Sequence, residues 1–515
     1  MLRIGIDVGG TNTDAVLMSG TSVLGWVKAG TTRDVTTGIT AALRELLAKT
    51  QAATSDISAV MIGTTHFVNA VVQRRDLTET AIVRLGLPAT KGLPPMIDWP
   101  SDLRDVLGNH AYLAHGGYEV DGRLIAPLDE AELRQIAADI RAKGISSVAV
   151  SAVFSPVNGE LEQRAAAILR EELPDVTFSV SSEIGRIGLL ERENAAIMNA
   201  CLADLGRKTI QAFRDALKEL NINAQLFLTQ NDGTLMSSEF AEKFPVLTFS
   251  SGPTNSMRGA AFLSGLKDAI VVDIGGTTTD VGVLSHGFPR ESSVAVEIGG
   301  VRTNFRMPDV YSIGLGGGSI VQTEPLAVGP RSVGYEITSK ARIFGGEQLT
   351  ASDIAVAAGM ADFGDRSKVA DLDTGLVERA VERIQNMVAE AVDRMKTSAT
   401  ALPVIVVGGG SILVRDQVEG ASELVKPDHY PVANAVGAAI AQISGEVDKI
   451  FTLVELTREA ALQQAREEAI ARAAAAGADP ASIQIVDVED VPLAYLPGNA
   501  TRIRVKAVGD LQIRS

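Results

Sequence analysis

Two stretches of the chain carry the same chemically useful residues in the same order. One is IGIDVGGTNTDAVL, from Ile4 to Leu17, and the other is IVVDIGGTTTDVGV, from Ile270 to Val283. Aligned without gaps, they share seven of fourteen residues, including two aspartates, a glycine pair and two threonines. Each begins as a buried strand of β-branched residues that ends in an acid, turns on the glycines and resumes as a strand. The repeat therefore predicts two similar hairpins with polar tips.

The tips of these hairpins have the residue types that hold phosphate. Glycine lets backbone N–H groups approach an anion closely, and threonine hydroxyls add donors. The leading aspartate, Asp7 or Asp273, is a hard oxygen ligand suited to Mg²⁺. A single copy could equally be an ordinary glycine-rich hairpin. Two copies 266 positions apart predict instead two similar domains that face one nucleotide.

A second candidate donor site is Gly63-Thr64-Thr65-His66, between a short apolar strand, Ala59 to Ile62, and a predicted helix, Val68 to Arg75. Because helix N-termini and hydroxyl groups favour anions, Thr64 and Thr65 are candidates to bind a ligand. The alternative is that one of them only caps the helix. His66 either touches substrate or makes a structural hydrogen bond.

Two later glycine runs end in serine: Gly316-Gly317-Gly318-Ser319 and Gly408-Gly409-Gly410-Ser411. A strand followed by such a run lets the backbone pass flat against a ligand at the start of a helix. The alternative is a tight turn between a strand and a helix. The second run, in VIVVGGGSIL, has the cleaner context, so it is the better candidate for the adenosine side of a nucleotide.

Composition limits the class of protein. The 515 residues are 46% hydrophobic and 21% charged, and 49 glycines with 4% aromatic residues favour an α/β protein rich in tight turns. The formal net charge is −16 and no continuous basic tract is present, which disfavours binding to nucleic acid or to an anionic membrane. A phosphate ligand would have to be held by backbone amides and a cation, so the acidity argues for Mg²⁺.

The single cysteine, Cys201, excludes a disulfide framework within the chain. The first methionine is followed by a strand pattern instead of a basic and apolar leader, and no apolar run approaches the ~20 residues of a membrane span. We therefore expect a cytoplasmic protein that binds neither nucleic acid nor membrane.

The middle and the end of the chain show a layered α/β organisation. A helix over roughly Asp129 to Lys143, a strand from Ser147 to Phe154 and a helix near Gly159 to Glu172 follow the βαβ rhythm. Residues 80 to 127 are rich in proline and glycine and predict an inserted loop region. The tail predicts a small α/β appendage. The expected domains are residues 1–200, 201–447 and 448–515.

Two Asp-Gly-Gly-Thr hairpins and a late GGGS turn resemble the actin-like ATPase and sugar-kinase superfamily. More narrowly, the chain resembles the A subunit of the hydantoinase and 5-oxoprolinase family over about residues 3 to 445. The ordered blocks that carry this resemblance are IGIDVGGTNTDAVL, GTTHFVNA, LLERENAAIMNA, FLTQNDGTLM, SSGPTNSMRGA, VVDIGGTTTDVGV, YSIGLGGGSIV with VGPRSVG, and GGEQLTASDI. The resemblance implies an α/β fold with two ribonuclease H-like (actin-like ATPase) domains around a nucleotide cleft, followed by the small C-terminal tail.

The family resemblance also implies an activity, the ATP-driven opening of a cyclic amide such as a hydantoin or 5-oxoproline. The γ-phosphoryl group would pass to the amide oxygen, water would attack the activated carbon, and the ring C–N bond would break. Phosphoryl transfer needs positioning and charge neutralisation above all, which hairpins, Mg²⁺ and amide donors provide.

By position, the resemblance assigns the residues that would hold ATP and Mg²⁺. Asp7 or Asp273 would hold the metal, directly or through water, and the other would orient or deprotonate the attacking group. Thr64, Thr65 and His66 are the substrate-side candidates. The nucleotide-side candidates are Gly9, Gly10, Thr11, Asn12, Thr13, Gly275, Gly276, Thr277, Thr278, Thr279, Gly316, Gly317, Gly318, Gly408, Gly409, Gly410 and Ser411. Asp14 and Asp280 would brace the hairpins.

Several functions stay open on the sequence. The chain is shorter than the large A subunits of the family and has no counterpart of the B subunit, so a separately encoded B-type partner and an oligomeric assembly are expected. An A-type subunit of an ATP-dependent carboxylase would use the same phosphorylation of a carbonyl oxygen. A small-molecule kinase would release a phosphorylated product, and a non-catalytic ATPase or reactivase module would respond to a protein partner.

Overall fold

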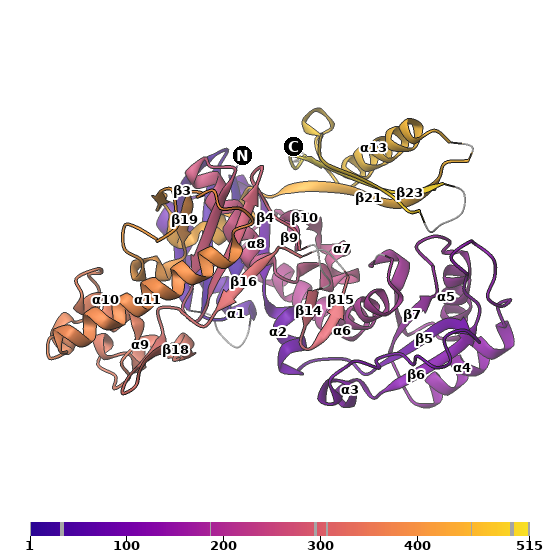
Figure 1. Ribbon diagram of the computed structural model, residues 1–515, viewed down its shortest axis with the longest axis horizontal. Coiled ribbons are helices and arrows are strands. Elements are labelled where there is room, and N and C mark those ends of the chain that lie inside the picture. Colours follow the sequence, from indigo (N-terminus) through magenta and orange to yellow (C-terminus); the bar gives the residue numbers. More distant parts are fainter. Residues whose placement is uncertain are drawn as a thin grey trace.

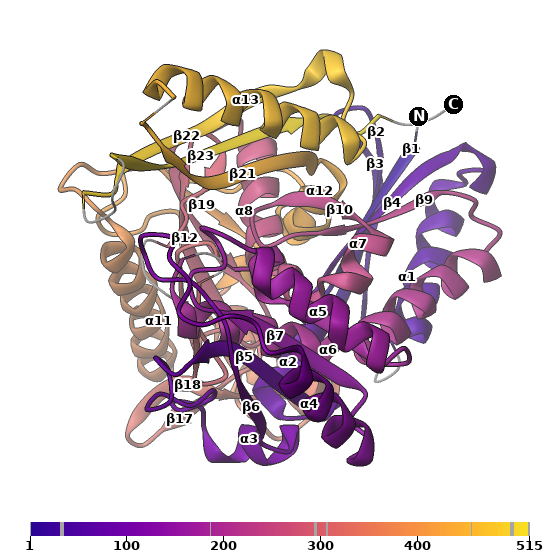
Figure 2. The ribbon, with the colours of Figure 1, turned by 90° about the vertical axis from the view of Figure 1, so that its right-hand side faces the viewer.

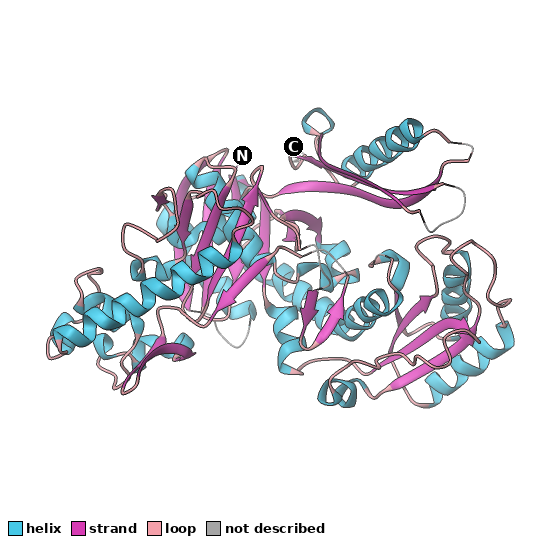
Figure 3. Cartoon of the chain, viewed as in Figure 1, coloured by secondary structure: helices cyan, strands magenta, loops and turns pink. Residues whose placement is uncertain are grey.

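The computed structural model of the protein describes residues 2–30, 35–185, 187–292, 296–304, 307–454, 456–494 and 499–512. It is a mixed α/β structure with two large sheets, a smaller parallel sheet and helices packed against them (Figure 1, Figure 3). The predicted α/β class is therefore confirmed, and the question becomes how the sheets place the two hairpins.

The first hairpin belongs to a nine-stranded sheet. In spatial order its strands are β22 (Gln484–Pro492), β23 (Ala500–Gly509), β21 (Gln442–Thr452), β10 (Thr234–Ser237), β9 (Gln225–Thr229), β4 (Ile57–Thr64), β1 (Leu2–Val8), β2 (Asn12–Ser19) and β3 (Ser22–Gly30). The strands β1, β4 and β9 run parallel to one another. Parallel strands end at the same edge of a sheet, so the residues at the ends of these three strands lie close together.

The second hairpin belongs to a six-stranded sheet. Its strands are β13 (Phe288–Pro289), β12 (Thr279–Ser285), β11 (Ala269–Ile274), β19 (Val404–Val407) and β20 (Leu424–Val425), with β16 (Val310–Ile313) also paired to β12. Here β11 runs parallel to β19, as β1 runs parallel to β4. The amphipathic helix α11 (Thr374–Met395) buries Val377, Val381, Ile384 and Val388 in the core of this half.

Residues 80–180 form a parallel sheet of their own, seen at the lower right of Figure 1. Its strands are β6 (His110–His115), β5 (Thr80–Leu87), β7 (Ser147–Ala152) and β8 (Thr177–Val180), and its helices are α3 (Ser101–Leu107), α4 (Glu130–Ala142) and α5 (Glu160–Glu172). The prediction of a loop region over residues 80 to 127 is wrong where β5, α3 and β6 lie. Because β5 is buried along almost its whole length, its sequence lacks the alternation that marks a half-exposed strand.

The long helix α6 (Leu189–Glu219) ties this parallel sheet to the nine-stranded sheet. The buried guanidinium of Arg84 on β5 donates to both carboxylate oxygens of Glu193 at 2.6 and 2.5 Å, and Ser151 donates to the same carboxylate at 2.6 Å. A buried charge of this kind is tolerated only when it is fully paired. Glu193 therefore fixes α6 to the strands β5 and β7 of the parallel sheet, which are far from it in the sequence.

Other helices and strands lie outside the three sheets described above. They are α1 (Val35–Thr50), α2 (His66–Gln73), α7 (Ser238–Lys243), α8 (Ser251–Ser264), α9 (Ile337–Lys340), α10 (Ala351–Ala357), α12 (Ala433–Ala439), α13 (Arg458–Ala475), β14 (Val296–Ile298), β15 (Val301–Thr303), β17 (Ser319–Thr323) and β18 (Leu326–Ser332).

Two of these helices, α8 and α12, cross in close contact because glycine faces backbone on both sides. A Cβ on Gly259 of α8 would lie 1.8 Å from the carbonyl oxygen of Ala433, and a Cβ on Gly437 of α12 would lie 1.8 Å from that of Asn255. In the same way, Gly5 of β1 leaves room for the carbonyl of Ala435. The alanine-rich helix α12 therefore packs directly on β1.

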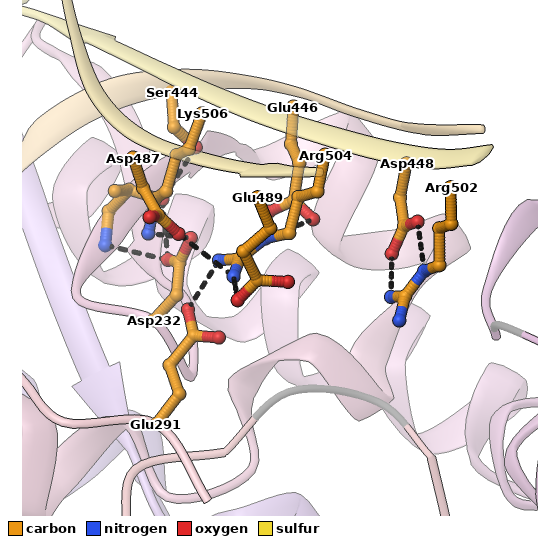
Figure 4. Close-up of polar contacts among 11 residues, drawn as sticks. Asp232, Glu291, Ser444, Glu446, Asp448, Asp487, Glu489, Arg502, Arg504 and Lys506 are labelled. Carbon is orange, nitrogen blue, oxygen red and sulfur yellow. Dashed lines mark hydrogen bonds and ion pairs between the residues drawn. The ribbon is translucent and has the colours of Figure 1, made fainter. Parts of the chain in front are cut away.

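The C-terminal strands continue the nine-stranded sheet, and α13 covers them (Figure 2). A row of basic residues on one face of β23 meets acidic residues on the neighbouring strands and on the body of the protein (Figure 4). Lys506 pairs with Asp232 at 2.7 Å, and Arg504 pairs with Glu291 at 2.9 Å. The tail is thus fixed to the β9–β10 turn and to the segment after β13.

Helix α6 and strand β21 each cross a position at which the sequence predicts a domain boundary, 200/201 and 447/448. The division into three domains stays a prediction. No helix among the described residues combines the length and the apolar character that a bilayer span needs.

Candidate functional site

The two repeated hairpins have the same strand register. Asp7 on β1 lies opposite Asp14 on β2, and Asp273 on β11 lies opposite Asp280 on β12. Side chains directly opposite each other in antiparallel strands lie on the same face of the sheet. Each hairpin therefore places two carboxylates side by side, at equivalent positions of two different sheets.

The turns at the tips are closed in the same way. The N–H of Gly9 donates to the carbonyl of Asn12 at 3.0 Å, and the N–H of Gly275 donates to the carbonyl of Thr278 at 2.9 Å. The sequence repeat is therefore a structural repeat down to the hydrogen bond that closes each turn.

In each sheet a further strand pairs with the second strand of the hairpin, β3 with β2 and β16 with β12. It adds one side chain beside the two aspartates, so that each sheet has a row of three facing residues. Lys28 on β3 lies opposite Asp14, whereas Ser312 on β16 lies opposite Asp280. The ammonium of Lys28 is 2.6 and 2.7 Å from the two oxygens of Asp14. The hydroxyl of Ser312 donates a short hydrogen bond to Asp280. One row thus contains a cation and the other a neutral donor.

Asn434, in the first turn of α12, bridges the two acids of the first hairpin. Its Nδ2 donates to Asp7 Oδ2 at 3.0 Å and to Asp14 Oδ2 at 2.8 Å. One amide therefore holds both carboxylates at a fixed separation.

Asp7 keeps one oxygen free of this network. It is 5% exposed, and no donor among the described residues hydrogen-bonds its Oδ1. Burial raises the pKa of Asp7 to about 7, and the charge of Asp14 adds to the rise, while the amides of Asn434 and of the nearby Asn255 oppose it; the Asn255 amide does not meet hydrogen-bond geometry to Oδ1. A buried acceptor without a donor costs stability, and such a cost is tolerated where a ligand or an ion satisfies the group.

The carboxylates of the second hairpin also have raised pKa values. Burial raises the pKa of Asp273, and a hydrogen bond from Ser256 of α8 opposes the rise. Burial also raises the pKa of Asp280 to about 6, opposed by the hydrogen bond from Ser312. Perturbed carboxylates collected at one place are a mark of a functional site.

The tips of the two hairpins face each other. A Cβ on Gly276 would lie 3.2 Å from the Cγ2 and 3.4 Å from the Oγ1 of Thr11, so these residues are neighbours across the two sheets. Two hairpins whose equivalent residues are 266 positions apart are thus brought to one place. Backbone N–H groups and threonine hydroxyls from both tips can reach a single anion there.

The threonines of the tips divide into two kinds. Thr13 and Thr279 are buried, and the hydroxyl of Thr279 donates to the carbonyl of Leu315 at 2.7 Å. Thr278, by contrast, is exposed, and the side chain of Thr11 faces the opposite hairpin. The residues nearest the turns are therefore better placed as ligand donors than those at the ends of the strands.

The run from Gly316 to Gly318 packs on the second tip. The N–H of Gly317 donates to the carbonyl of Gly275 at 3.0 Å, and that of Gly318 to the carbonyl of Gly276 at 2.8 Å. The run lies between β16 and β17 and does not begin a helix, so the expected helix start is wrong here. These two N–H groups brace the hairpin.

The run from Gly408 to Ser411 packs on the strand that carries Asp273. A Cβ on Gly408, which has φ of +87°, would lie 2.3 Å from Asp273 Oδ1. The segment continues as a short 3₁₀ turn over Gly409–Leu413. Only glycine leaves this carboxylate room, so the run shapes the site of the second hairpin.

Thr64, Thr65 and His66 lie at the edge where β1 and β4 end. Thr64 is opposite Val8, the residue after Asp7, and the hydroxyl of Thr65 donates to the carbonyl of Val8 at 3.4 Å. His66 is half-buried and begins α2, and its N–H donates to Thr64 Oγ1 at 3.1 Å. Burial lowers the pKa of His66, so the neutral imidazole is favoured.

Helix α8 passes between the two acid pairs. Its first turn faces Asp7, because a Cβ on Gly252 would lie 4.0 Å from Asp7 Oδ1. One turn further, Ser256 lies against Asp273. The N-terminal half of this helix therefore lies along both leading aspartates, with its first turn beside Asp7.

The residues present fit Mg²⁺ only together with phosphate. In the described part of the chain, no group of three or more His, Cys, Asp or Glu side chains is arranged to hold a metal by itself. Magnesium in phosphate-transferring sites is commonly held by one or two carboxylates together with phosphate oxygens. The unpartnered Oδ1 of Asp7 suits that arrangement.

Two paired acid hairpins on two sheets, facing each other beside a helix N-terminus, define the class of an actin-like ATPase fold. Within that class, the chain belongs to the hydantoinase/oxoprolinase family. Residues 3–173 match the hydantoinase/oxoprolinase N-terminal region, and residues 192–363 match the hydantoinase/oxoprolinase domain.

Known relatives agree with this placement. The chain is 28% identical over 384 residues to caprolactamase subunit alpha of Pseudomonas jessenii, covering 69% of this chain and 54% of the relative. It is 26% identical over 385 residues to the acetone carboxylase beta subunit of Xanthobacter autotrophicus, covering 68% of this chain and 53% of the relative. The chain thus spans about half the length of these curated relatives.

A solved structure supports the fold. The ATP-dependent caprolactamase from Pseudomonas jessenii has a TM-score of 0.78 with this chain at 20% identity, covering 99% of this chain and 88% of that one. The expected actin-like ATPase architecture is therefore confirmed.

Proposed function

We propose that the chain binds ATP with Mg²⁺ between the two hairpins and drives the opening of a cyclic amide by phosphorylation of the amide oxygen. The observation that carries the proposal is the facing pair of hairpins with equal register, which brings Thr11 to Gly276 and lines the contact with two acid pairs. The similarity to a caprolactamase subunit favours a lactam as the substrate class.

In this proposal Asp7 is the magnesium ligand, because its Oδ1 is buried and has no donor within the described residues. Asp273 then orients or deprotonates the attacking water, a role that suits a carboxylate whose pKa is raised by burial. Bound ATP would supply the phosphoryl group that turns the amide oxygen into a leaving group. The tip residues Thr11, Asn12, Thr277 and Thr278 would donate to its phosphates.

The substrate side of the proposal is the edge formed by Thr64, Thr65 and His66. This edge lies beside the strand that carries Asp7, and Thr65 is 3.4 Å from the Cβ position of Gly252 at the start of α8. Because the curated relatives are named as subunits and are longer than this chain, we propose that a separate B-type subunit completes the ring-opening reaction. Assembly as an oligomer and a cytoplasmic location are parts of the same proposal.

A carboxylase subunit is the second candidate, favoured by the similarity to the acetone carboxylase beta subunit. Both reactions activate a carbonyl oxygen by phosphorylation, so the hairpins alone do not separate them.

ADP release separates the candidates. It is measured with caprolactam, 5-oxoproline and hydantoin, and with acetone or acetophenone plus bicarbonate, each with and without a co-purified partner. We expect lactam-dependent ADP release, a ring-opened amino acid as product, and no requirement for bicarbonate. Bicarbonate-dependent consumption of a ketone would establish the carboxylase instead. Stimulation by a sugar alone would indicate a kinase, and stimulation by a protein alone an ATPase module; either would refute the proposal.

A further inference from the structure

Lys28 lies where three segments of the site meet. Its ammonium contacts Asp14 of the first hairpin, and its Cε is 3.9 Å from the Cβ position of Gly409 in the GGGS turn of the second half. Its positive charge also acts on Asp273. The side chain therefore extends from the first hairpin across to the segment that shapes the second.

Lys28 and Asp14 differ in how far they are exposed to solvent. The side chain of Asp14 is 3% exposed, whereas that of Lys28 is 27% exposed. A lysine ammonium has three donors, and the two oxygens of Asp14 account for only part of this capacity. The end of Lys28 therefore combines a buried contact with access from outside.

Neutralising Asp14 does not by itself explain a lysine at this position. Asn434 already donates to Asp14, and the equivalent carboxylate of the second hairpin, Asp280, is held by the hydroxyl of Ser312. Within the described residues, Lys28 is the only lysine or arginine that pairs with any of the four hairpin carboxylates. A polyphosphate placed among four carboxylates needs compensating positive charge, and a magnesium ion supplies only part of it.

We propose that Lys28 is a phosphate-binding residue of the cleft, with its ammonium shared between Asp14 and a phosphate of the bound nucleotide. This inference rests on the proposed nucleotide site and adds to it a contact that the hairpin motif does not contain. Asp14 acts in it as a positioning residue that holds the ammonium at the first hairpin.

The test separates a phosphate contact from simple neutralisation of Asp14. Binding of a non-hydrolysable ATP analogue with Mg²⁺, and of adenosine, is measured by calorimetry for the wild type, Lys28→Met, Lys28→Arg and the double variant Lys28→Met/Asp14→Asn, together with the Tm of each. We expect Lys28→Met to weaken the analogue about 10-fold or more, which corresponds to about 1.4 kcal/mol, and to leave adenosine unchanged. Lys28→Arg, which keeps a charged donor, should stay within about 3-fold of the wild type.

The double variant decides between the two roles. It removes the carboxylate that would otherwise be left without its cation, so its Tm should return towards the wild-type value while its affinity for the analogue stays low. Recovery of both the Tm and the affinity would show that Lys28 only neutralises Asp14 and would overturn the inference. An equal loss of adenosine binding in Lys28→Met would overturn it too, because the effect would then not be specific to phosphate.

The outcome also distinguishes this inference from the proposed function. A wild-type protein that binds no ATP analogue would refute the nucleotide site and the role of Lys28 together. A wild-type protein that binds the analogue, with Lys28→Met binding it equally well, would refute the role of Lys28 alone. If Lys28→Met does not fold, the double variant and Lys28→Gln provide the same comparison.

Discussion

The two hairpins are alike in chemistry and different in support. Both place a pair of aspartates in the same register and close their turns with the same hydrogen bond. The first tip is open, since a Cβ on Gly10 would meet no described atom within 4 Å. The second tip is braced by two hydrogen bonds from the run Gly316 to Gly318. The same motif is therefore free in one half and enclosed in the other.

The rows of side chains behind the tips differ in a corresponding way. In the first row a lysine pairs with the second aspartate, and in the other row a serine does. We therefore expect the two hairpins to contribute differently to ligand binding. The second hairpin would stay fixed when a ligand binds, whereas the first hairpin, with its open tip and its cation, would adjust to the ligand.

The leading aspartates should be equally necessary in spite of this difference. Replacing either Asp7 or Asp273 by alanine is expected to lower ATP turnover by about 10³-fold or more, because each removes a charged group at the place of phosphoryl transfer. The measurement is steady-state ADP release, with circular dichroism to establish that both variants are folded.

The magnesium dependence of ATP-analogue binding should distinguish the two leading aspartates. If Asp7 is the metal ligand, Asp7→Asn should require more Mg²⁺ for half-maximal binding of an ATP analogue, and Asp273→Asn should not. Unchanged turnover in Asp273→Ala would remove that residue from the mechanism, and an unchanged Mg²⁺ requirement in Asp7→Asn would remove Asp7 as the ligand.

The hairpins could be predicted from the sequence because strand, turn glycines and acids are contiguous in each copy. Lys28 could not, although it lies in the adjacent strand. A regular two-residue turn between β2 and β3 would place Val27 opposite Asp14. A bulge at Leu24 shifts the pairing by one residue and brings Lys28 to that position instead. Gly25, next to Leu24, is compatible with a bulge but does not fix its position or the resulting register.

Asn434 and Ser256 cannot be predicted from the sequence for another reason. Each is a short polar residue in a helix rich in small residues, which is typical of close helix packing, and the sequence gives no indication of which side faces an acid. Their contacts depend on the crossing of α8 and α12, which juxtaposes segments almost 180 residues apart in the chain. The long-range arrangement of the site therefore follows from packing that no single motif contains.

The brace on the second tip can be tested with a pair of glycine variants. A Cβ on Gly316 would lie 2.5 Å from the backbone nitrogen of Thr277, so Gly316→Ala is expected to lower the free energy of unfolding by about 2–3 kcal/mol. Gly10→Ala is the matched control at the open tip and should change it by no more than about 0.5 kcal/mol. Denaturant unfolding of both variants measures the difference. Equal effects would mean that the two tips are equally enclosed.

The second aspartates should make opposite contributions to stability at pH 7. The pKa of Asp280 is about 6 in the folded protein, above its ordinary value of 3.8, so the folded state binds the proton more tightly and stability is lost as the pH rises through this window. Asp280→Asn should therefore be more stable than the wild type at pH 7, by about 1–2 kcal/mol for a half-buried group, and gain nothing below pH 4. Asp14→Asn, which deprives Lys28 of its partner, should be less stable than the wild type at pH 7.

Thermal unfolding from pH 4 to pH 8 measures both variants. If Asp14→Asn stabilised the protein as Asp280→Asn does, the lysine would not compensate for the burial of Asp14, and the contrast between the rows would fail.

The smallest expected effect comes from placing a lysine opposite Asp280, as Lys28 lies opposite Asp14 in the first hairpin. Ser312 is exposed, so Ser312→Lys places an ammonium opposite Asp280 without burying it. Such a pair should contribute about 0.5 kcal/mol at pH 7 and low ionic strength, and the gain should fade as salt is added and as Asp280 is protonated below pH 6. Ser312→Met is the control, since it has a long side chain without charge and also removes the hydroxyl. A stabilisation of Ser312→Lys that persists in high salt, or that Ser312→Met reproduces, would come from packing, and the difference between the two rows would then not be one of charge.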